Sequence, residues 1–343
     1  MADKKMLIWL PSPMGDAILS VPALRAFRRH FSDHRILFWG SAVNRAILSP
    51  SPFCDGWIEP PGGYWKSISA LKAAQLSACI LLKNSFGSAL SAWLAGVERR
   101  IGYARDGRSV LLTEKIAPLK DDAGRFVPTP ATEYYLRIAE SLGADITDRT
   151  TELSFTEADR AALAEPLPGV FDRRGPLVIL VPGGAFGPSK CWPSERFSRT
   201  ADALIEKHKA TVLVSVAPNE REQQIAAEIV RHARDPLLNL GQTPLGLGPL
   251  KALFACADLV ITNDTGPRHI AIALKRRVVT LFGPNNPQWT QTEYADEIRI
   301  VGTGPCVPCD KPVCRQPHHY CMESITVDQV LEAAEAQLAK GRA

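Results

Sequence analysis

A carboxylate follows a glycine in the segment at residues 10–20, LPSPMGDAILS, where an apolar run gives way to a helical pattern. Asp16 has two roles open to it at such a position. Aspartate is a good helix cap, and a carboxylate can also take a proton from an attacking hydroxyl during catalysis. Ser20 and Pro22 offer a second helix start a few residues later, which would leave Asp16 free for chemistry. The residues alone leave both roles open.

A strand, a tight turn and a helix are predicted over residues 260–274, VITNDTGPRHIAIAL. Asp264, Thr265 and Gly266 fall where the helix should begin, and His269 lies within its first turn. Backbone N–H groups at a helix start lack partners and the helix dipole favours an anion, so a phosphate could be held there. The alternative is that Asp264 or Thr265 is a plain N-cap and His269 is satisfied locally.

Two further turns carry charged side chains after apolar runs. The loop at residues 182–193, PGGAFGPSKCWP, contains Lys190, whose compact charge suits a diphosphate; the alternative is a lysine that faces solvent. After the next apolar run, Glu220 or its rival Glu222 could accept hydrogen bonds from ribose hydroxyls. The alternative is that these glutamates only place negative charge in the first turn of a helix, where it complements the helix dipole. A phosphate seat, a cation and a ribose acceptor together indicate a nucleotide-diphosphate site.

The elements that must position these residues follow an alternating pattern. Continuous Val, Ile and Leu runs are typical of strands buried on both faces of a parallel sheet, and helix-compatible segments separate them. We therefore predict an α/β fold of two doubly wound Rossmann-like domains that face each other across a cleft. The predicted strands are residues 5–10, 35–40, 78–83, 176–184, 211–218, 258–264 and 277–283.

We divide the chain into residues 1–160, an N-terminal acceptor-binding domain, and 161–325, a nucleotide-sugar-binding domain. Residues 326–343 should form a C-terminal helix, because Thr326 and Gln329 resemble a capping box and apolar residues recur at helical spacing. We expect this helix to pack back on the N-terminal domain. No G-x-G-x-x-G follows the first strand, which argues against a dinucleotide oxidoreductase.

Composition narrows the functional classes further. A formal net charge of +4 with 22% charged residues does not predict a nucleic-acid partner. No secretory signal is visible, and no run approaches the roughly 20 apolar residues of a spanning helix, so we expect a cytoplasmic protein. Its eight cysteines are then thiols or ligands. Cys306, Cys309, Cys314 and Cys321 either hold a structural metal or remain free thiols or a redox-sensitive pair.

These segments resemble the glycosyltransferase family that includes the lipopolysaccharide heptosyltransferases, with the heptosyltransferase II branch as the nearest. The resemblance runs from the first strand to about Thr326. It is carried by PSPMGDAILSVPALRAF, NSFGSALSAWLAGVERRIGY, PGGAFGPSKCWPSERF, TNDTGPRHIAIAL and CVPCDKPVCRQPHHYCM. The family implies the GT-B arrangement and an inverting transfer of a manno-heptose from ADP-heptose to the heptosyl-Kdo-lipid A inner core of lipopolysaccharide.

The resemblance also assigns roles to residues. The catalytic base falls on Asp16, which makes us favour catalysis over capping, and the donor contacts are the following: Lys190, Glu220, Asp264, Thr265, Gly266 and His269. Pro267 and Arg268 depart from the apolar pair expected in the family's turn. The leaving group is already a good one, so we expect no general acid and no required cofactor.

Acceptor contacts are expected in the first domain because the acceptor carries phosphates and carboxylates. The candidates are Asn84, Ser85, Arg99, Arg100 and Arg105, with Arg108 in the same basic cluster. Since the acceptor is lipid-linked, we expect peripheral contact with the inner face of the cytoplasmic membrane. The rivals are a relative that uses another nucleotide sugar or acceptor, and a nucleotide-sugar-binding protein without turnover.

Overall fold

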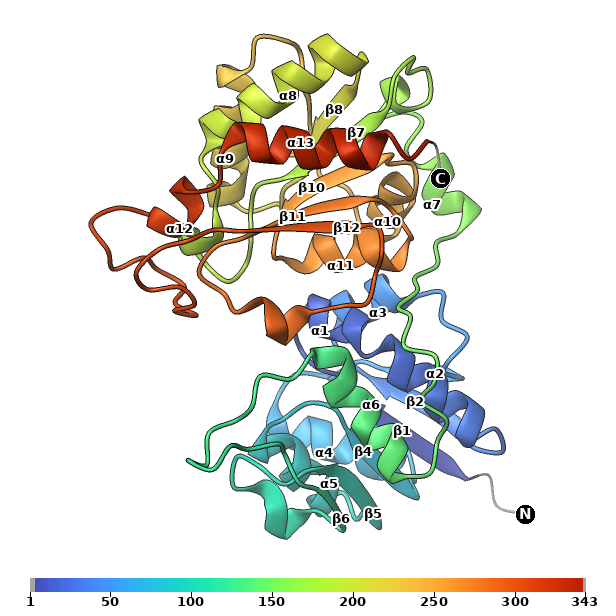
Figure 1. The fold of residues 1–343 in the computed structure, drawn as a ribbon. Helices are drawn as coiled ribbons and strands as arrows, with labels where there is room; N and C mark the ends of the chain where they lie inside the picture. The colour runs from blue at the N-terminus through green and yellow to red at the C-terminus, as the bar shows by residue number, and fades with distance from the viewer. Residues whose placement is uncertain (1–3, 342–343) are drawn as a thin grey trace. The chain divides into compact units, whose positions relative to one another are not determined.

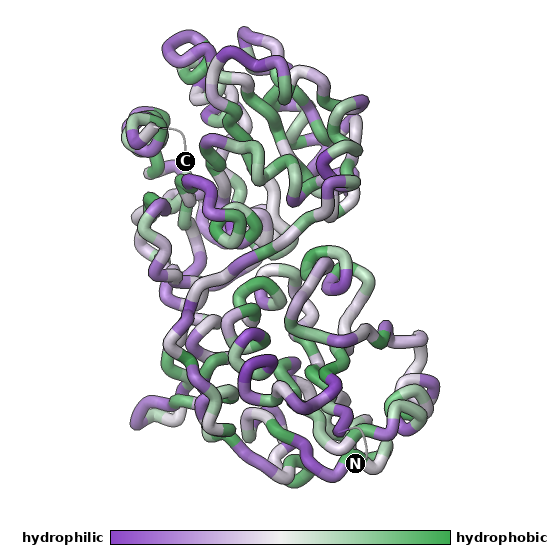
Figure 2. The backbone as a smooth tube through the Cα atoms, turned by 90° about the vertical axis from the view of Figure 1, so that its right-hand side faces the viewer, coloured by the Kyte–Doolittle hydropathy of each residue, from purple (hydrophilic) through white to green (hydrophobic). Residues whose placement is uncertain are grey.

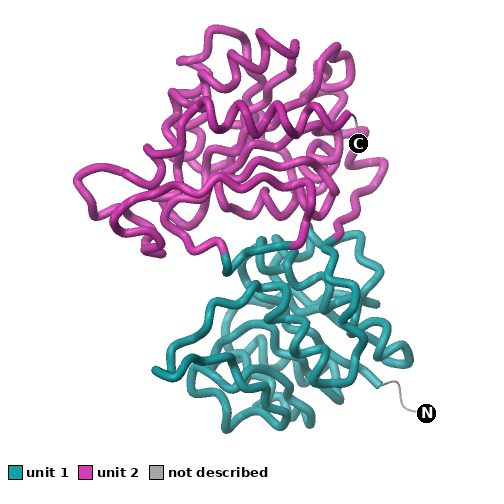
Figure 3. Tube along the Cα trace, in the orientation of Figure 1, with its two compact units in different colours: residues 1–151, 288–292 teal, residues 152–287, 293–343 magenta. Residues whose placement is uncertain are grey.

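The computed structural model describes residues 4–341 and divides into two compact units (Figure 3). Unit 1 comprises Met1–Thr151 and Gln288–Thr292, and unit 2 comprises Glu152–Pro287 and Glu293–Ala343. The division therefore falls after Thr151 rather than after residue 160. The proline-containing stretch that prompted the predicted boundary belongs to unit 2, where it forms the short turn η2 (Pro168–Val170) with Val170 buried.

Unit 1 is built on a sheet of six parallel strands (Figure 1). Its order is β3-β2-β1-β4-β5-β6. The strands are β1 (Lys5–Trp9), β2 (Arg35–Trp39), β3 (Gly56–Ile58), β4 (Ala78–Leu81), β5 (Arg99–Tyr103) and β6 (Glu114–Ile116). The helices are α1 (Met14–Leu19), α2 (Val21–His30), α3 (Ala42–Leu48), α4 (Tyr64–Ala73), α5 (Phe86–Leu94) and α6 (Ala131–Ser141), with the turn η1 (Arg108–Leu111).

Unit 2 repeats this plan with a second sheet of six parallel strands. The order is β12-β11-β10-β7-β8-β9. When the strands of each sheet are renumbered from one along the chain, both sheets have the same doubly wound order, 3-2-1-4-5-6. The strands are β7 (Leu177–Val181), β8 (Thr211–Val214), β9 (Leu238–Asn239), β10 (Leu259–Asn263), β11 (Val278–Phe282) and β12 (Glu297–Val301).

The helices of unit 2 cover both faces of its sheet. They are α7 (Glu157–Ala161), α8 (Ser194–His208), α9 (Glu220–His232), α10 (Leu247–Ala255), α11 (Gly266–Ala273), α12 (Tyr320–Glu323) and α13 (Val327–Leu338), with the turn η3 (Pro188–Lys190). All but the first residue of the turn η4 (Pro287–Thr290) belong to unit 1. In both units the central strands are buried, and the tube in Figure 2 is hydrophobic along them. The predicted fold of two doubly wound sheets is confirmed within each unit.

The C-terminal helix α13 forms as predicted but docks elsewhere. Its capping box is present, with the Thr326 hydroxyl accepting from the Gln329 N–H. The helix packs on α8 and on β10, β11 and β12 of unit 2, and Val330 and Ala334 join that unit's core. The expectation that it packs on the N-terminal domain is therefore wrong. Because α8 and α9 cover the β7–β9 half of their face, the β10–β12 half needs another helix, and α13 supplies it.

Five strands were not predicted from the sequence: β3, β5, β6, β9 and β12. All are short, or carry charged residues, because they lie at or near a sheet edge where one side is open to solvent. The most consequential of these is β5, which begins with two of the candidate acceptor arginines, Arg99 and Arg100.

Candidate active site

The predicted site residues gather at the point in each sheet where the strand order reverses. In unit 1 this point lies between β1, which leads to Asp16, and β4, which leads to Asn84. In unit 2 it lies between β7, which leads to Lys190, and β10, which leads to Asp264. Doubly wound sheets bind ligands in the crevice outside the carboxyl ends of the strands at this position. Each unit therefore carries one candidate binding edge.

Asp16 is not a helix cap. It is the third residue of α1, whose N-cap is Pro13. Ser20 precedes α2, as predicted, although its hydroxyl donates to the Ala17 carbonyl oxygen at 2.8 Å and does not cap the helix. No hydrogen bond engages the Asp16 carboxylate among residues 4–341. Burial raises its pKa, and a carboxylate with a raised pKa is a better proton acceptor.

Lys190 and Asp264 form a buried ion pair in unit 2. The Lys190 Nζ donates to the Asp264 Oδ2 at 2.9 Å and to its main-chain oxygen at 2.7 Å. Lys190 is only 8% exposed, so the alternative of a solvent-facing lysine is wrong. Burial by itself would raise the pKa of Asp264, but the charges of Lys190 and Arg268 outweigh it and lower that pKa. The pair fixes an ammonium group beside the start of α11.

Arg268, the residue that departs from the family pattern, holds the other side of Asp264. Its guanidinium donates to the Asp264 Oδ1 at 3.2 Å and, through two nitrogens, to Glu297 at 2.6 and 3.0 Å. The Thr280 hydroxyl also donates to Glu297, at 2.6 Å. Arg268 is fully buried. Sequence analysis did not assign these three residues, although the four-residue spacing of Asp264 and Arg268 is the spacing of a helical ion pair.

The N-terminus of α11 is a candidate anion-binding site. Thr265 is the N-cap, and its side chain makes no capping hydrogen bond. Gly266 and Pro267 form the first turn, and proline there removes a donor that the helix does not use. A Cβ at Gly184 would lie 2.8 Å from the Thr265 methyl carbon, so only glycine lets the β7 loop approach this closely. The departure at Pro267 therefore leaves the predicted turn intact.

His269 is buried and neutral. Burial, together with the charge of Arg268, lowers its pKa to about 3. Its Nδ1 has no hydrogen-bond partner among the described residues. The imidazole is therefore neutral near pH 7, and in this form it can donate or accept a hydrogen bond.

Of the two rival glutamates, Glu222 lies beside the glycine-rich loop. Its carboxylate accepts from the Ala217 N–H at 2.9 Å, and a Cβ at Gly183 would fall 2.2 Å from its Oε2. Glu220 is exposed in the first turn of α9. The structure therefore brings Glu222, the rival, to the binding edge, and leaves the preferred Glu220 on the surface.

The acceptor candidates separate into two groups. Arg99 and Arg100 begin β5, so they lie at the amino edge of the sheet, opposite the carboxyl ends that carry Asp16 and Asn84. Arg99 pairs with Glu114 there, and Arg100 donates to the Leu111 main-chain oxygen at 2.6 Å. The predicted acceptor role of both arginines is not supported, because a strand of five residues separates them from the binding edge.

The remaining candidates lie at the correct edge of the sheet. Arg105 follows β5, and its guanidinium lies 4.3 Å from the centre of the Phe126 ring. Arg108 is fully buried and donates to the Asn84 Oδ1 at 2.8 Å, so it positions Asn84 rather than binding ligand itself. Ser85 caps α5 by accepting from the Ser88 N–H.

The cysteine-rich loop gives no support to the metal site considered above. All eight cysteines are free thiols, and within residues 4–341 no three His, Cys, Asp or Glu side chains are placed to hold a metal ion. The loop is anchored through its backbone, where Cys309 donates to the Pro284 carbonyl oxygen at 2.9 Å. Burial and the neighbouring thiols raise the pKa of Cys321, which favours its protonated form.

Comparison with known proteins places this geometry in a family. The model of glycosyltransferase family 9 (heptosyltransferase) matches residues 64–319. Lipopolysaccharide heptosyltransferase 1 of Pseudomonas aeruginosa is 31% identical, with 90% of this chain and 87% of that protein aligned. Lipopolysaccharide heptosyltransferase 2 of Escherichia coli K12 is 27% identical, with 97% of this chain and 98% of that protein aligned.

Solved structures agree on the fold. The family 9 glycosyltransferase of Veillonella parvula superposes with a TM-score of 0.82 at 22% identity, and 98% of each chain is covered. ADP-heptose lipopolysaccharide heptosyltransferase II of E. coli superposes with a TM-score of 0.79 at 24% identity, covering 98% of this chain and 99% of that one. Both sheets of this chain therefore have the GT-B type of architecture. The chain belongs to glycosyltransferase family 9, the heptosyltransferase family.

Proposed function

We propose that this glycosyltransferase moves a manno-heptose from ADP-heptose to the heptosyl-Kdo-lipid A inner core of lipopolysaccharide, with inversion at the anomeric carbon. One observation carries the donor side of the proposal. The Lys190 ammonium is buried and held by Asp264 at the start of α11, where unpaired N–H groups and a helix dipole favour a phosphate. The names of the aligned relatives support heptose as the sugar and lipopolysaccharide as the acceptor.

The chemistry follows from the charges of these residues. Asp16 accepts the proton of the attacking hydroxyl, and that hydroxyl oxygen bonds to the anomeric carbon as the bond to the ADP oxygen breaks. Lys190 and the N–H groups of the α11 start stabilise the negative charge that develops on the departing diphosphate. Glu222 is the proposed partner of the ribose hydroxyls, in place of Glu220. These residues supply the stabilisation that a divalent cation would otherwise give, so we propose that no cofactor is required.

The test uses the purified protein with ADP-heptose and a heptosyl-Kdo-lipid A acceptor, and it measures ADP release. The expected result is release that depends on the acceptor and that disappears in the Asp16→Asn variant. Turnover with another nucleotide sugar, but not with ADP-heptose, would assign the protein to a different transferase. Binding of ADP without turnover of any donor would assign it to a binding protein.

We further propose that unit 1 contacts the membrane that carries the acceptor. No helix within residues 4–341 is long and apolar enough to cross a bilayer. Instead, Phe86 and Trp93 are 47% and 50% exposed on one face of α5, seven residues apart, and Trp65 is 74% exposed on α4. Lys72 is exposed seven residues after Trp65, on the same helix face. Helices α4 and α5 pack on each other, and exposed aromatic rings together with an exposed lysine suit the interface of an anionic bilayer.

Vesicle sedimentation tests this contact. Vesicles with about a third anionic lipid should retain the wild-type protein, and the double change Trp65→Ser with Trp93→Ser should weaken retention. Phe171→Ser is the matched control, because Phe171 is 42% exposed on unit 2. Equal retention of the wild type and the double variant would remove this surface from the proposal.

A further inference from the structure

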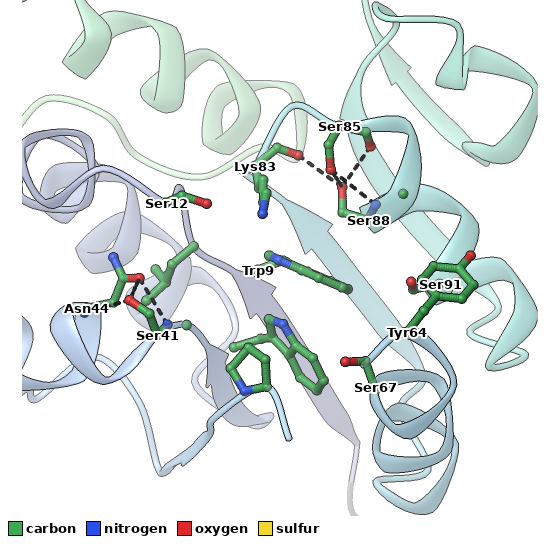
Figure 4. A pocket seen from close by; sticks show the side chains of 15 residues that line it. Trp9, Ser12, Ser41, Asn44, Tyr64, Ser67, Lys83, Ser85, Ser88 and Ser91 are labelled. Atoms are coloured by element: carbon green, nitrogen blue, oxygen red, sulfur yellow. Dashed lines mark hydrogen bonds between the residues drawn. The ribbon is translucent and has the colours of Figure 1, made fainter. Parts of the chain in front are cut away.

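A pocket of about 330 Å³ opens at the carboxyl edge of the unit 1 sheet (Figure 4). Its walls come from the ends of β1, β2 and β4 and from α3, α4 and α5. The β1–α1 loop, which leads to Asp16, contributes Leu10 and Ser12 to the lining. The loop that precedes the helix of the proposed base therefore also lines this pocket. The volume is at the lower end of the range of small-ligand sites, about 300–1,000 Å³, which suits one sugar residue better than a nucleotide.

Two indole rings form the apolar part of the pocket. Trp9 and Trp39 are the last residues of β1 and β2 and are paired in register, so their side chains project from the same face of the sheet. Their ring centres lie 4.9 Å apart. Both rings are held rigidly in the core of unit 1 and still line the pocket. A rigid aromatic surface of this kind packs against the C–H face of a sugar ring.

The polar part of the pocket includes one cation and three hydroxyls without a hydrogen-bond partner among the described residues. Figure 4 shows the Lys83 ammonium pointing into the pocket toward Trp9. No acidic residue lines the pocket, and Lys83 forms no ion pair with the residues that the structure describes. Ser91 is 97% buried yet lines the pocket, and its hydroxyl and those of Ser12 and Tyr64 have no hydrogen-bond partner among residues 4–341.

The other hydroxyls of the lining are already engaged. The Ser41 hydroxyl donates to the Asn44 side chain, and the Ser88 hydroxyl donates to the Lys83 carbonyl oxygen. The unused polar groups are therefore the ammonium of Lys83 and the hydroxyls of Ser12, Tyr64 and Ser91, which line the same pocket as the indole rings. Ser12 is exposed and Lys83 is half-buried, so these groups are accessible to a ligand.

We infer that this pocket binds an acidic sugar residue of the acceptor, with the sugar ring on Trp9 and its carboxylate or phosphate on Lys83. The inference rests on the proposed function and specifies its acceptor. Lys83, Ser91 and Trp9 then determine acceptor specificity, and Asn84 and Ser85 position the loop that carries Lys83. Lysine recognises an anion as a point charge, so a neutral sugar of the same shape should bind weakly.

The first experiment measures binding without turnover. Tryptophan fluorescence of the wild-type protein is titrated with the methyl glycoside of Kdo, with its neutral methyl ester and with mannose 6-phosphate. Binding of an anionic sugar, with the ester weaker by about 10- to 150-fold, supports the inference; preference for Kdo identifies the carboxylate, and preference for mannose 6-phosphate identifies the phosphate. Equal binding of acid and ester, or no binding of either anion, overturns it.

The second experiment uses variants. Lys83→Met should raise the KM for the acceptor by about 10- to 150-fold, and Ser91→Ala, a smaller change to the core, by about 3- to 10-fold. The KM for ADP-heptose should not change. Lys115→Met is the matched control, because Lys115 is exposed and lies outside the pocket. An unchanged acceptor KM in both pocket variants overturns the inference. If ADP-heptose is not turned over at all, the proposed function fails, whereas the fluorescence titration still decides the pocket.

Discussion

Replacement of Arg268 by methionine tests whether the buried charge network holds the donor site together. Arg268 and its partners Glu297 and Asp264 are almost completely buried, with side chains 0%, 2% and 6% exposed. Arg268→Met leaves the Glu297 carboxylate without its bidentate cation, while Asp264 keeps its ion pair with Lys190. Removing one partner of a buried pair costs about 3–5 kcal/mol, because the other charge stays buried and uncompensated. For a unit of about 190 residues, this corresponds to a Tm roughly 6–20 °C lower.

Calorimetry of the Arg268→Met protein, with ADP affinity measured by titration, is the assay. The double variant Arg268→Met with Glu297→Gln removes the second charge and should recover at least half of the lost Tm, because an apolar and a neutral side chain can share the site at little cost. Lys340→Met is the control, since Lys340 and its partner Asp296 are 44% and 46% exposed, and loss of this surface pair should cost less than about 1 kcal/mol. A Tm loss below about 2 °C, or no recovery in the double variant, would refute the reasoning.

Four further predictions follow from the same geometry. Asp16→Asn should lower kcat by about 100- to 10,000-fold while calorimetric ADP affinity stays within twofold; weakened ADP binding would contradict a purely catalytic role. Asp16 works as a base only when it is deprotonated, and burial raises its pKa. As the pH falls, kcat/KM should therefore decline with an inflection above about 3.9, the pKa of an ordinary aspartate; an inflection below that value would count against Asp16 as the base. Turnover should be unchanged by millimolar EDTA, and its loss with recovery on adding a metal would show that a cation is needed. Ala334→Glu should unfold or strongly destabilise unit 2, because Ala334 is fully buried against its sheet and a charge there has no partner; an unaltered melting curve would mean that α13 does not dock.

Local patterns were sufficient for much of this protein. The buried strands β1, β4, β7 and β10 are continuous apolar runs, so their type and the turns that follow them were predictable. Those four turns carry or lead directly to the following residues: Asp16, Asn84, Lys190 and Asp264. Because the carboxyl ends of parallel strands share one sheet edge, the sequence also predicts which side chains gather at each binding edge.

Other features depend on contacts between distant residues, and there local patterns failed. Arg99 and Arg100 had been grouped with Arg105 by sequence proximity, but β5 carries them to the opposite edge of the sheet from Arg105. The choice between Glu220 and Glu222 depends on which face of α9 meets the glycine-rich loop, and two residues along a helix point in different directions.

The sequence by itself determined the fold class, the family and the position of each chemical group along a strand or turn, because these follow from apolar periodicity and short motifs. Only the tertiary structure decided the state of those groups. Burial makes His269 neutral, the pairing of Arg268 with Glu297 depends on residues far apart in the chain, and the bare half of the unit 2 sheet determines where α13 docks. Solvent exclusion and long-range pairing arise only when the chain has folded, and no local pattern of residues contains them.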